Sequence, residues 1–119
     1  MRGVVVRDWT ASFPEGVVFR AGDRVQLEKF DPDWPGWVWS VSPCGPGAWA
    51  PLSMIESESD LGGPLPVAGR FLEDYESTEL TAPAGERLTL FRETSGWYWA
   101  EDGAGRRGWI PARCVDPDV

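Results

Sequence analysis

The stretch AGERLTLFRETSGWYWAEDGAGRRGWIP, residues 84–111, decides the fold. Two runs of apolar and aromatic residues, 87–91 and 97–101, are separated by a polar loop that ends in Gly96, which predicts a β-hairpin. A second Gly-containing turn at 102–105 leads into a third short run at 108–110. The stretch therefore predicts three consecutive antiparallel strands. No segment of the chain has a sustained helical period.

The same pattern occurs earlier in the chain, in residues 21–51. AGDRVQL at 21–27 matches AGERLTL at 84–90, GWVW at 36–39 matches GWYW at 96–99, and WAP at 49–51 matches WIP at 109–111. Such self-similarity indicates two copies of one supersecondary unit. Each copy has roughly 50 to 55 residues, which is small for an independent core but within the range of domains that fold alone.

The segment SESDLGGPLP, residues 57–66, has the polar, Gly- and Pro-containing composition of a linker. We therefore expect an all-β protein with one small domain at 1–56, which is the more divergent copy, and a second at 67–119. Alternation along the strands assigns the core positions. They are Val25, Leu27, Val41, Ala50 and Ile55 in the first copy and Leu72, Leu80, Leu88, Leu90, Ala100, Ile110 and Val115 in the second.

The chain is acidic, with a formal net charge of −8, and both halves carry an excess of Asp and Glu. Proteins that neutralise phosphates concentrate Lys and Arg, whereas only Arg106-Arg107 pairs two bases here. We therefore expect no nucleic-acid partner and a ligand with basic residues. No membrane association is expected, and the short apolar run at 4–6 is not a signal peptide, which favours a cytoplasmic protein.

Catalytic and metal chemistry has few candidate residues. The chain has no histidine and two cysteines, Cys44 and Cys114, without metal-ligand spacing. Ordinary nucleophilic triads are therefore unavailable, and no carboxylate pair stands out, so we expect neither an enzyme nor a cofactor or metal site. We interpret Cys114 as a buried apolar residue and Asp8 and Asp74 as turn acceptors. A bridge between the two cysteines is a minor alternative.

Both copies resemble the Src-homology-3 (SH3) family, and the second copy resembles it more closely. FLEDY at 71–75 is similar to the family's opening Ala-Leu-Tyr-Asp-Tyr stretch, and GWYWA at 96–100 to its Gly-Trp-Trp-x-Ala strand. GWIPARCV at 108–115 is similar to the closing Gly-x-Ile-Pro-Ser-Asn-Tyr-Val. The resemblance implies two five-stranded barrels in tandem. It also implies that each barrel binds an extended, often proline-rich, peptide in an aromatic groove.

Carried over by position, the resemblance implies the groove residues of each copy. In the second copy they are Tyr75, Trp97, Trp109 and Pro111, with Glu76 and Glu79 selecting a basic ligand residue; in the first they are Trp9, Trp37, Trp49 and Pro51, with Glu15 as the acid. The family's first opening tyrosine is replaced by Arg7 or Glu73 and its closing tyrosine by Met54 or Cys114. A different peptide, or a protein surface spanning both barrels, is therefore an alternative ligand.

The eight tryptophans cannot all fit inside such small barrels, so we expect several to be exposed. Trp37 and Trp97 are expected to contact the ligand, whereas Trp39 and Trp99 are expected to pack within the protein. The leading prediction is thus a non-enzymatic protein- or peptide-binding module. The alternative is a structural protein, monomeric or homodimeric, whose aromatic faces are buried between the barrels or between two chains.

Overall fold

The computed structural model describes residues 1–43 and 45–118 and is all-β. No helix within these residues is long and apolar enough to span a membrane. The strands are β1 (Arg2–Val5), β2 (Val18–Phe19), β3 (Arg24–Phe30), β4 (Trp37–Val41), β5 (Gly47–Pro51), β6 (Ile55–Ser57), β7 (Val67–Phe71), β8 (Tyr75–Glu76), β9 (Arg87–Thr94), β10 (Trp97–Glu101), β11 (Arg107–Pro111) and β12 (Val115–Pro117). Two short 3-10 helices, η1 (Leu52–Met54) and η2 (Ala112–Cys114), each precede the last strand of a repeat.

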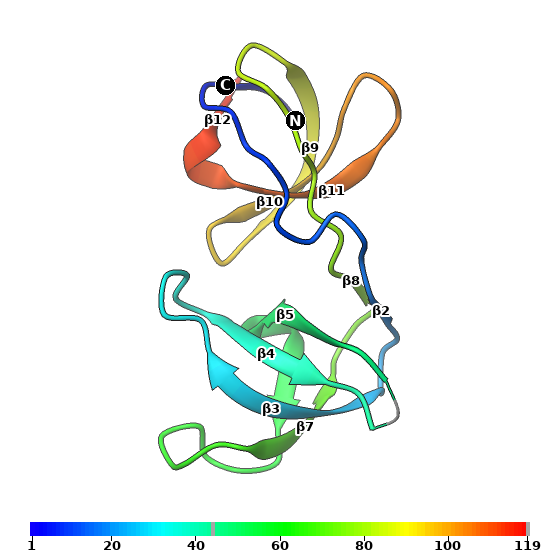
Figure 1. Cartoon of the computed structure of the whole chain (residues 1–119), viewed down its shortest axis with the longest axis vertical. Coiled ribbons are helices and arrows are strands. Elements are labelled where there is room, and N and C mark those ends of the chain that lie inside the picture. The colour runs from blue at the N-terminus through cyan, green and yellow to red at the C-terminus, as the bar shows by residue number, and fades with distance from the viewer. Residues whose placement is uncertain (44, 119) are drawn as a thin grey trace. The chain divides into compact units, whose positions relative to one another are not determined.

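The chain divides into two compact units, and their boundaries do not follow the repeats (Figure 1). Unit 1 consists of residues 1–16 and 78–119, and unit 2 consists of residues 17–77. Each unit contains one five-stranded antiparallel sheet, with the order β11-β10-β9-β1-β12 in unit 1 and β5-β4-β3-β7-β6 in unit 2. The short strands β2 and β8 pair with each other within unit 2.

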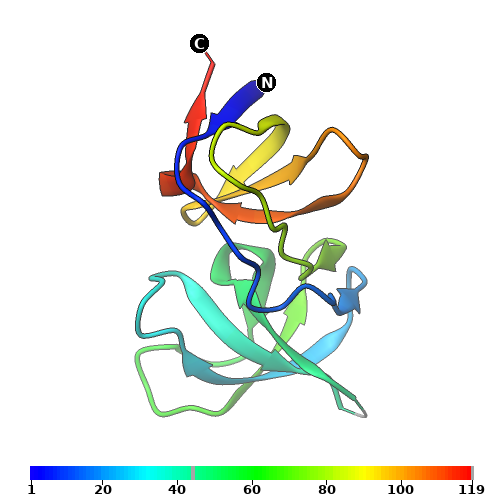
Figure 2. The same ribbon diagram turned by 45° about the horizontal axis from the view of Figure 1, so that its top comes forward.

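The first strand of each repeat belongs to the sheet of the other repeat. Strand β1, from the first repeat, lies between β9 and β12, and β7, from the second repeat, lies between β3 and β6. Figure 2 shows the first of these arrangements, with the blue N-terminal strand beside the red C-terminal strand. The two repeats have therefore exchanged their opening strands reciprocally.

The two exchanged strands occupy equivalent positions. Gly3 of β1 faces Leu88, and Gly69 of β7 faces Val25, which is the residue that matches Leu88 in the repeat. Both positions are crowded: a Cβ on Gly3 would lie 2.9 Å from Leu90 and from Val115, and one on Gly69 would lie 3.0 Å from Ile55. Glycine lets both strands cross the core at the same point.

The last residue of each exchanged strand and the aspartate three residues later are also held in the same way. Gly85 donates its N–H to the Val5 carbonyl at 2.7 Å, and Gly22 donates to the Phe71 carbonyl at 2.7 Å. The Asp8 carboxylate accepts the N–H of Ala84 at 2.7 Å, and the Asp74 carboxylate accepts that of Ala21 at 2.9 Å. The interpretation of Asp8 and Asp74 as turn acceptors is confirmed, and each caps a turn of the other repeat.

The expected division into 1–56, a linker at 57–66 and 67–119 differs from these units. Ser57 is the last residue of β6, and the segment 58–66 connects β6 to β7 as the loop of an antiparallel hairpin inside unit 2. The connections between the units lie instead at 16–17 and 77–78. Composition marked 57–66 as a turn-rich connection, but the elements that it joins are two strands of one sheet.

The two exchanged strands make the same backbone bonds. They differ in the side chains that surround them in each unit. In unit 2, Phe71 of β7 stacks on Phe19 with ring centroids 4.5 Å apart, and both rings stack with Tyr75. The residue of unit 1 that matches Phe19 is Ala82, which pairs with Trp9 through hydrogen bonds in both directions. At these positions unit 2 therefore has three stacked rings, whereas unit 1 has the small residue Ala82 beside the ring of Trp9.

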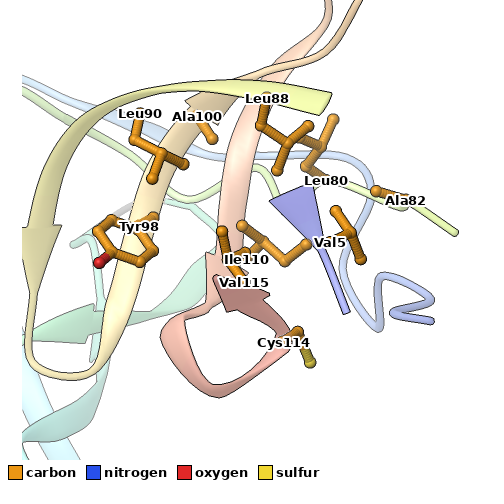
Figure 3. Close-up of a cluster of buried hydrophobic side chains, with 10 residues drawn as sticks. All are labelled: Val5, Leu80, Ala82, Leu88, Leu90, Tyr98, Ala100, Ile110, Cys114 and Val115. Atoms are coloured by element: carbon orange, nitrogen blue, oxygen red, sulfur yellow. The ribbon is translucent and has the colours of Figure 1, made fainter. Parts of the chain in front are cut away.

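The core of unit 1 is a single cluster of buried side chains drawn from both repeats (Figure 3). Val5 of the exchanged strand is 1% exposed and packs with residues of the second repeat. Cys114 belongs to the same cluster, which confirms its interpretation as a buried apolar residue. The other members are Leu80, Ala82, Leu88, Leu90, Tyr98, Ala100, Ile110 and Val115.

Most of the expected core positions are buried, and two are not. Leu72 is 53% exposed because β7 ends at the buried Phe71, so that the next side chain in the alternation points outward. Its counterpart Val6, which follows the buried Val5, is 51% exposed for the same reason. Val41, at the end of β4, is half-buried. The remaining expected positions are buried.

Candidate functional site

The expected groove residues are regrouped by the strand exchange. Unit 1 contains Trp9, Glu15, Glu79, Trp97, Trp109 and Pro111, and unit 2 contains Trp37, Trp49, Pro51, Tyr75 and Glu76. Each unit therefore takes its opening aromatic, Trp9 or Tyr75, from the repeat that does not supply its meander. This grouping differs from the repeat-by-repeat assignment, because the opening strand of each repeat pairs with the other sheet.

In unit 1 the opening aromatic contacts the meander directly. Trp9 and Trp97 meet edge to face, with ring centroids 5.5 Å apart and planes inclined by 85°. Trp97 lies opposite Pro111 in the β10–β11 ladder. Trp109 donates its backbone N–H to the Thr78 carbonyl at 2.8 Å, and its own carbonyl accepts the N–H of Leu80 at 2.9 Å. These bonds hold residues 78–80 against β11.

Glu79 is engaged within unit 1. Its carboxylate accepts the backbone N–H of Ser12 at 3.1 Å. Burial raises the pKa of this carboxyl above its ordinary value of 4.5, although hydrogen bonds involving Ser12, Trp9 and Phe13 act in the opposite direction. Its backbone N–H also donates to the Phe13 carbonyl at 3.1 Å. Glu79 therefore holds the segment 9–13 in place. The sequence-based prediction for Glu79 was a role in ligand selection.

In unit 2 the outer face of the sheet carries a pair of tryptophans. Trp39 and Trp49 lie opposite each other in the β4–β5 ladder, with ring centroids 5.2 Å apart and planes inclined by 71°. The Lys29 ammonium lies 5.8 Å from the centre of the Trp49 ring, at cation–π distance. The Trp39 indole lies close against Gly47, where a Cβ would come within 2.8 Å of it. Both indoles are half-buried.

Unit 1 has the same pair at the matching positions. Trp99 and Trp109 lie opposite each other in the β10–β11 ladder, with ring centroids 5.4 Å apart. Next to them on the β11 strand, Arg107 lies over Phe91 at 4.9 Å from the ring centre and forms an ion pair with Glu101 at 2.9 Å. Sequence reasoning missed these cross-strand pairs. The signal was available, since each pair occupies the same positions of a repeated hairpin.

Most of the expected groove side chains are buried in the chain. Trp37 is 5% exposed, Trp97 is 7%, Trp109 is 4% and Tyr75 is 4%, and Pro51 and Pro111 are buried as well. The expectation that several tryptophans are exposed is thus wrong for the described residues, where each tryptophan is buried or half-buried. The phenol of the buried Tyr75 donates to the Trp49 carbonyl at 2.7 Å.

The partly accessible residues form a smaller set. Trp9, Trp39, Trp49 and Trp99 are half-buried, and Glu15 and Glu76 are exposed. The described residues contain no group of three or more Cys, Asp or Glu side chains that could hold a metal ion. Cys44 lies outside the described residues, so the alternative of a Cys44–Cys114 bridge is not addressed by the structure. Comparison with protein-family models, with curated proteins and with solved structures finds no match.

Proposed function

We propose that units 1 and 2 are SH3-like barrels and that the protein is a non-enzymatic protein- or peptide-binding module. The order of elements supports this proposal: in each unit a three-strand meander is followed by a 3-10 turn and a short closing strand beside the opening strand. The resemblance of the motifs at 71–75, 96–100 and 108–115 to those of the SH3 family supports the same assignment.

The tryptophan pairs carry the functional part of the proposal. Trp39–Trp49 and Trp99–Trp109 occur at the same ladder positions in both units, and three of the four indoles are half-buried. A sheet face lined by partly accessible aromatic rings suits an extended ligand, which can lie across the rings with little loss of conformational entropy. Indole N–H groups can also donate to the carbonyls of such a ligand.

The charge distribution favours a basic ligand and favours unit 2. Unit 2 contains ten acidic and four basic residues, whereas unit 1 contains nine acidic and seven basic residues. Three of the four bases of unit 2 form ion pairs with its own acids, and the fourth, Lys29, lies over Trp49. A ligand with Arg or Lys would therefore meet a field of net negative charge around unit 2. Exposed Glu76 is the candidate selecting acid there.

One observation favours a second candidate function, a structural role for the aromatic faces. Trp37, Trp97 and Trp109 are buried without any second chain. Aromatic side chains that are already removed from water stabilise the folded chain and have little surface to offer a ligand. On this reading the protein has no free peptide ligand, and its tryptophans serve its own stability.

A titration of the intact chain distinguishes the two functions. We would follow the tryptophan indole signals by heteronuclear NMR while adding arginine-containing peptides, both proline-rich and proline-free. The binding proposal expects the Trp39 and Trp49 signals to move and the Trp39→Ala variant to lose at least about tenfold in affinity. Trp99→Ala, the matching change in unit 1, shows whether the second tryptophan pair also contributes to binding. Indole signals that stay fixed with every peptide would support the structural role.

A further inference from the structure

The N-terminal arm, residues 1–16, is held by many bonds to residues 78–119, and the chain continues from the arm into unit 2 at 16–17. Its strand β1 pairs with β9 and β12, its Trp9 is bridged to Ala82, and its Ser12 and Phe13 bond to Glu79. Every one of these partners lies within 78–119. A second copy of the chain offers the same partners to the arm.

The five-stranded sheet of unit 2 is formed without a strand from the arm. Unit 2 is a continuous segment of the chain, and its two ends are bonded to each other: Val17 donates its N–H to the Ser77 hydroxyl at 2.8 Å, and Ser77 donates its N–H to the Val17 carbonyl at 3.0 Å. Releasing the arm from residues 78–119 therefore breaks no pairing within unit 2. Releasing the arm would expose the core of unit 1 around Val5. Only another copy of the arm can cover this core with the same contacts.

The chain crosses between the two units at 16–17 and 77–78, and this crossing is crowded at Gly16. A Cβ built on Gly16 would overlap the hydroxyl of Thr78 and would lie 2.5 Å from its backbone nitrogen. This close approach is a consequence of the closed single chain, because the bonded pair Val17 and Ser77 brings the neighbouring residues 16 and 78 together. In a pair of chains that exchange arms, Gly16 and the Thr78 beside it would belong to different chains, whose residues 17 and 77 are not bonded to each other.

We propose that a second copy of this chain is a binding partner of the protein, through reciprocal exchange of residues 1–16. The exchanged dimer would keep every ladder of unit 1 and would differ from the monomer in the path of the chain at 16–17 and 77–78. The monomer is favoured at low concentration, because the tether keeps its own arm at an effective concentration on the order of millimolar. A change that disturbs the Gly16–Thr78 contact shifts the equilibrium toward the dimer.

The test compares two Gly→Ala changes in the full chain by sedimentation and light scattering, from micromolar to millimolar concentration. Gly16→Ala should lower the dissociation constant of the dimer at least about tenfold. Gly103→Ala is the matched control, since a Cβ at Gly103 meets nothing within 4 Å. A folded Gly16→Ala variant whose mass matches that of the control at every concentration would overturn the proposal.

A cysteine pair identifies which segment is exchanged and keeps the wild-type Gly16. Ala11 donates its N–H to the Thr81 hydroxyl at 3.0 Å, so Ala11→Cys with Thr81→Cys places one thiol on the arm and one on its partner segment. After refolding at increasing protein concentration, an increasing fraction of the double-cysteine variant should run as a covalent dimer on a non-reducing gel. The chain without the added cysteine pair is the control. Disulfides that remain within single chains at every concentration would exclude arm exchange, even if the chain dimerised in another way.

Discussion

Phe19 and Phe71 come from different repeats and stack in the core of unit 2, with ring centroids 4.5 Å apart and planes inclined by 18°. Both rings are almost completely buried, and both lie against Tyr75. The stack joins the second strand of the first repeat to the opening strand of the second. It is therefore a side-chain contact that only the exchanged arrangement of strands provides.

The Phe19–Phe71 stack should contribute strongly to the stability of unit 2. Replacing either ring by alanine leaves a cavity and removes the aromatic contact, so Phe71→Ala and Phe19→Ala should each cost about 3–5 kcal/mol of unfolding free energy. Denaturant titration of both single variants and the double variant measures this cost and the coupling between them. A double variant whose loss equals the sum of the two single losses would contradict a specific stacking contribution.

Unit 2 should fold as the isolated fragment 17–77. Its strands are contiguous in sequence and its ends are held together by the Val17–Ser77 bonds. The repeat fragment 1–56 offers β1 in place of β7, so Val5 would replace Phe71 against Phe19. We expect 17–77 to show a cooperative thermal transition at a higher temperature than 1–56, measured by circular dichroism. The reverse order would contradict the unit boundaries.

Glu79 should make stability decrease as the pH rises above 4.5. Burial raises the pKa of this carboxyl in the folded protein, so between the ordinary value of 4.5 and the raised value the folded chain binds more protons than the unfolded chain. Relative to Glu79→Gln, the wild-type protein should therefore lose unfolding free energy across that interval and stay constant above it. Urea titrations at several pH values measure this, with Glu15→Gln, a change at an exposed carboxyl of the N-terminal segment 1–16, as the control.

Asp102 should stabilise the turn between β10 and β11. Burial acts to raise the pKa of its carboxyl, but hydrogen bonds from the Arg106 and Ala104 backbone and the Arg106 guanidinium lower it below the ordinary value of 3.8. Asp102→Asn should cost about 1–3 kcal/mol at neutral pH. Its cost should shrink as the pH falls below 3.8, where the wild-type carboxyl becomes protonated in the unfolded and then the folded protein.

A neighbouring ion pair provides the control for Asp102. Glu101 and Arg107 also form an ion pair, but the Arg107 side chain is 56% exposed, and exposed pairs contribute only about 0–1 kcal/mol. Glu101→Gln should therefore change the unfolding free energy by less than Asp102→Asn. An equal loss in the two variants would show that the burial of Asp102 does not set its contribution.

The meanders were predictable because each depends on neighbouring residues. The runs 87–91, 97–101 and 108–110 correspond to β9, β10 and β11, which span 87–94, 97–101 and 107–111. Turn chemistry and alternation act over a few residues, so they are visible in sequence. Leu72 was misassigned because alternation identifies two faces but needs a fixed starting residue to say which face is inside.

The candidate site was less predictable than the meanders. Tryptophan at 37, 39, 97 and 99 identified strands with an aromatic face, but the burial of Trp37 and Trp97 depends on what packs against them. In unit 1 one such neighbour is Trp9, which reaches Trp97 only because its strand has crossed to the other sheet. The pairing of Trp39 with Trp49 follows from the register between β4 and β5, which the sequence alone leaves open.

The sequence alone determined that this is an all-β protein built from two copies of one meander, with glycines and aspartates at the turns. Only the tertiary structure decided which copy each opening strand joins. The reason is physical: β1 and β7 make the same backbone bonds in equivalent registers, so local pattern cannot distinguish the two arrangements. The choice rests on long-range side-chain packing, such as Phe71 on Phe19 and Trp9 on Trp97, which exists only once the chain has folded.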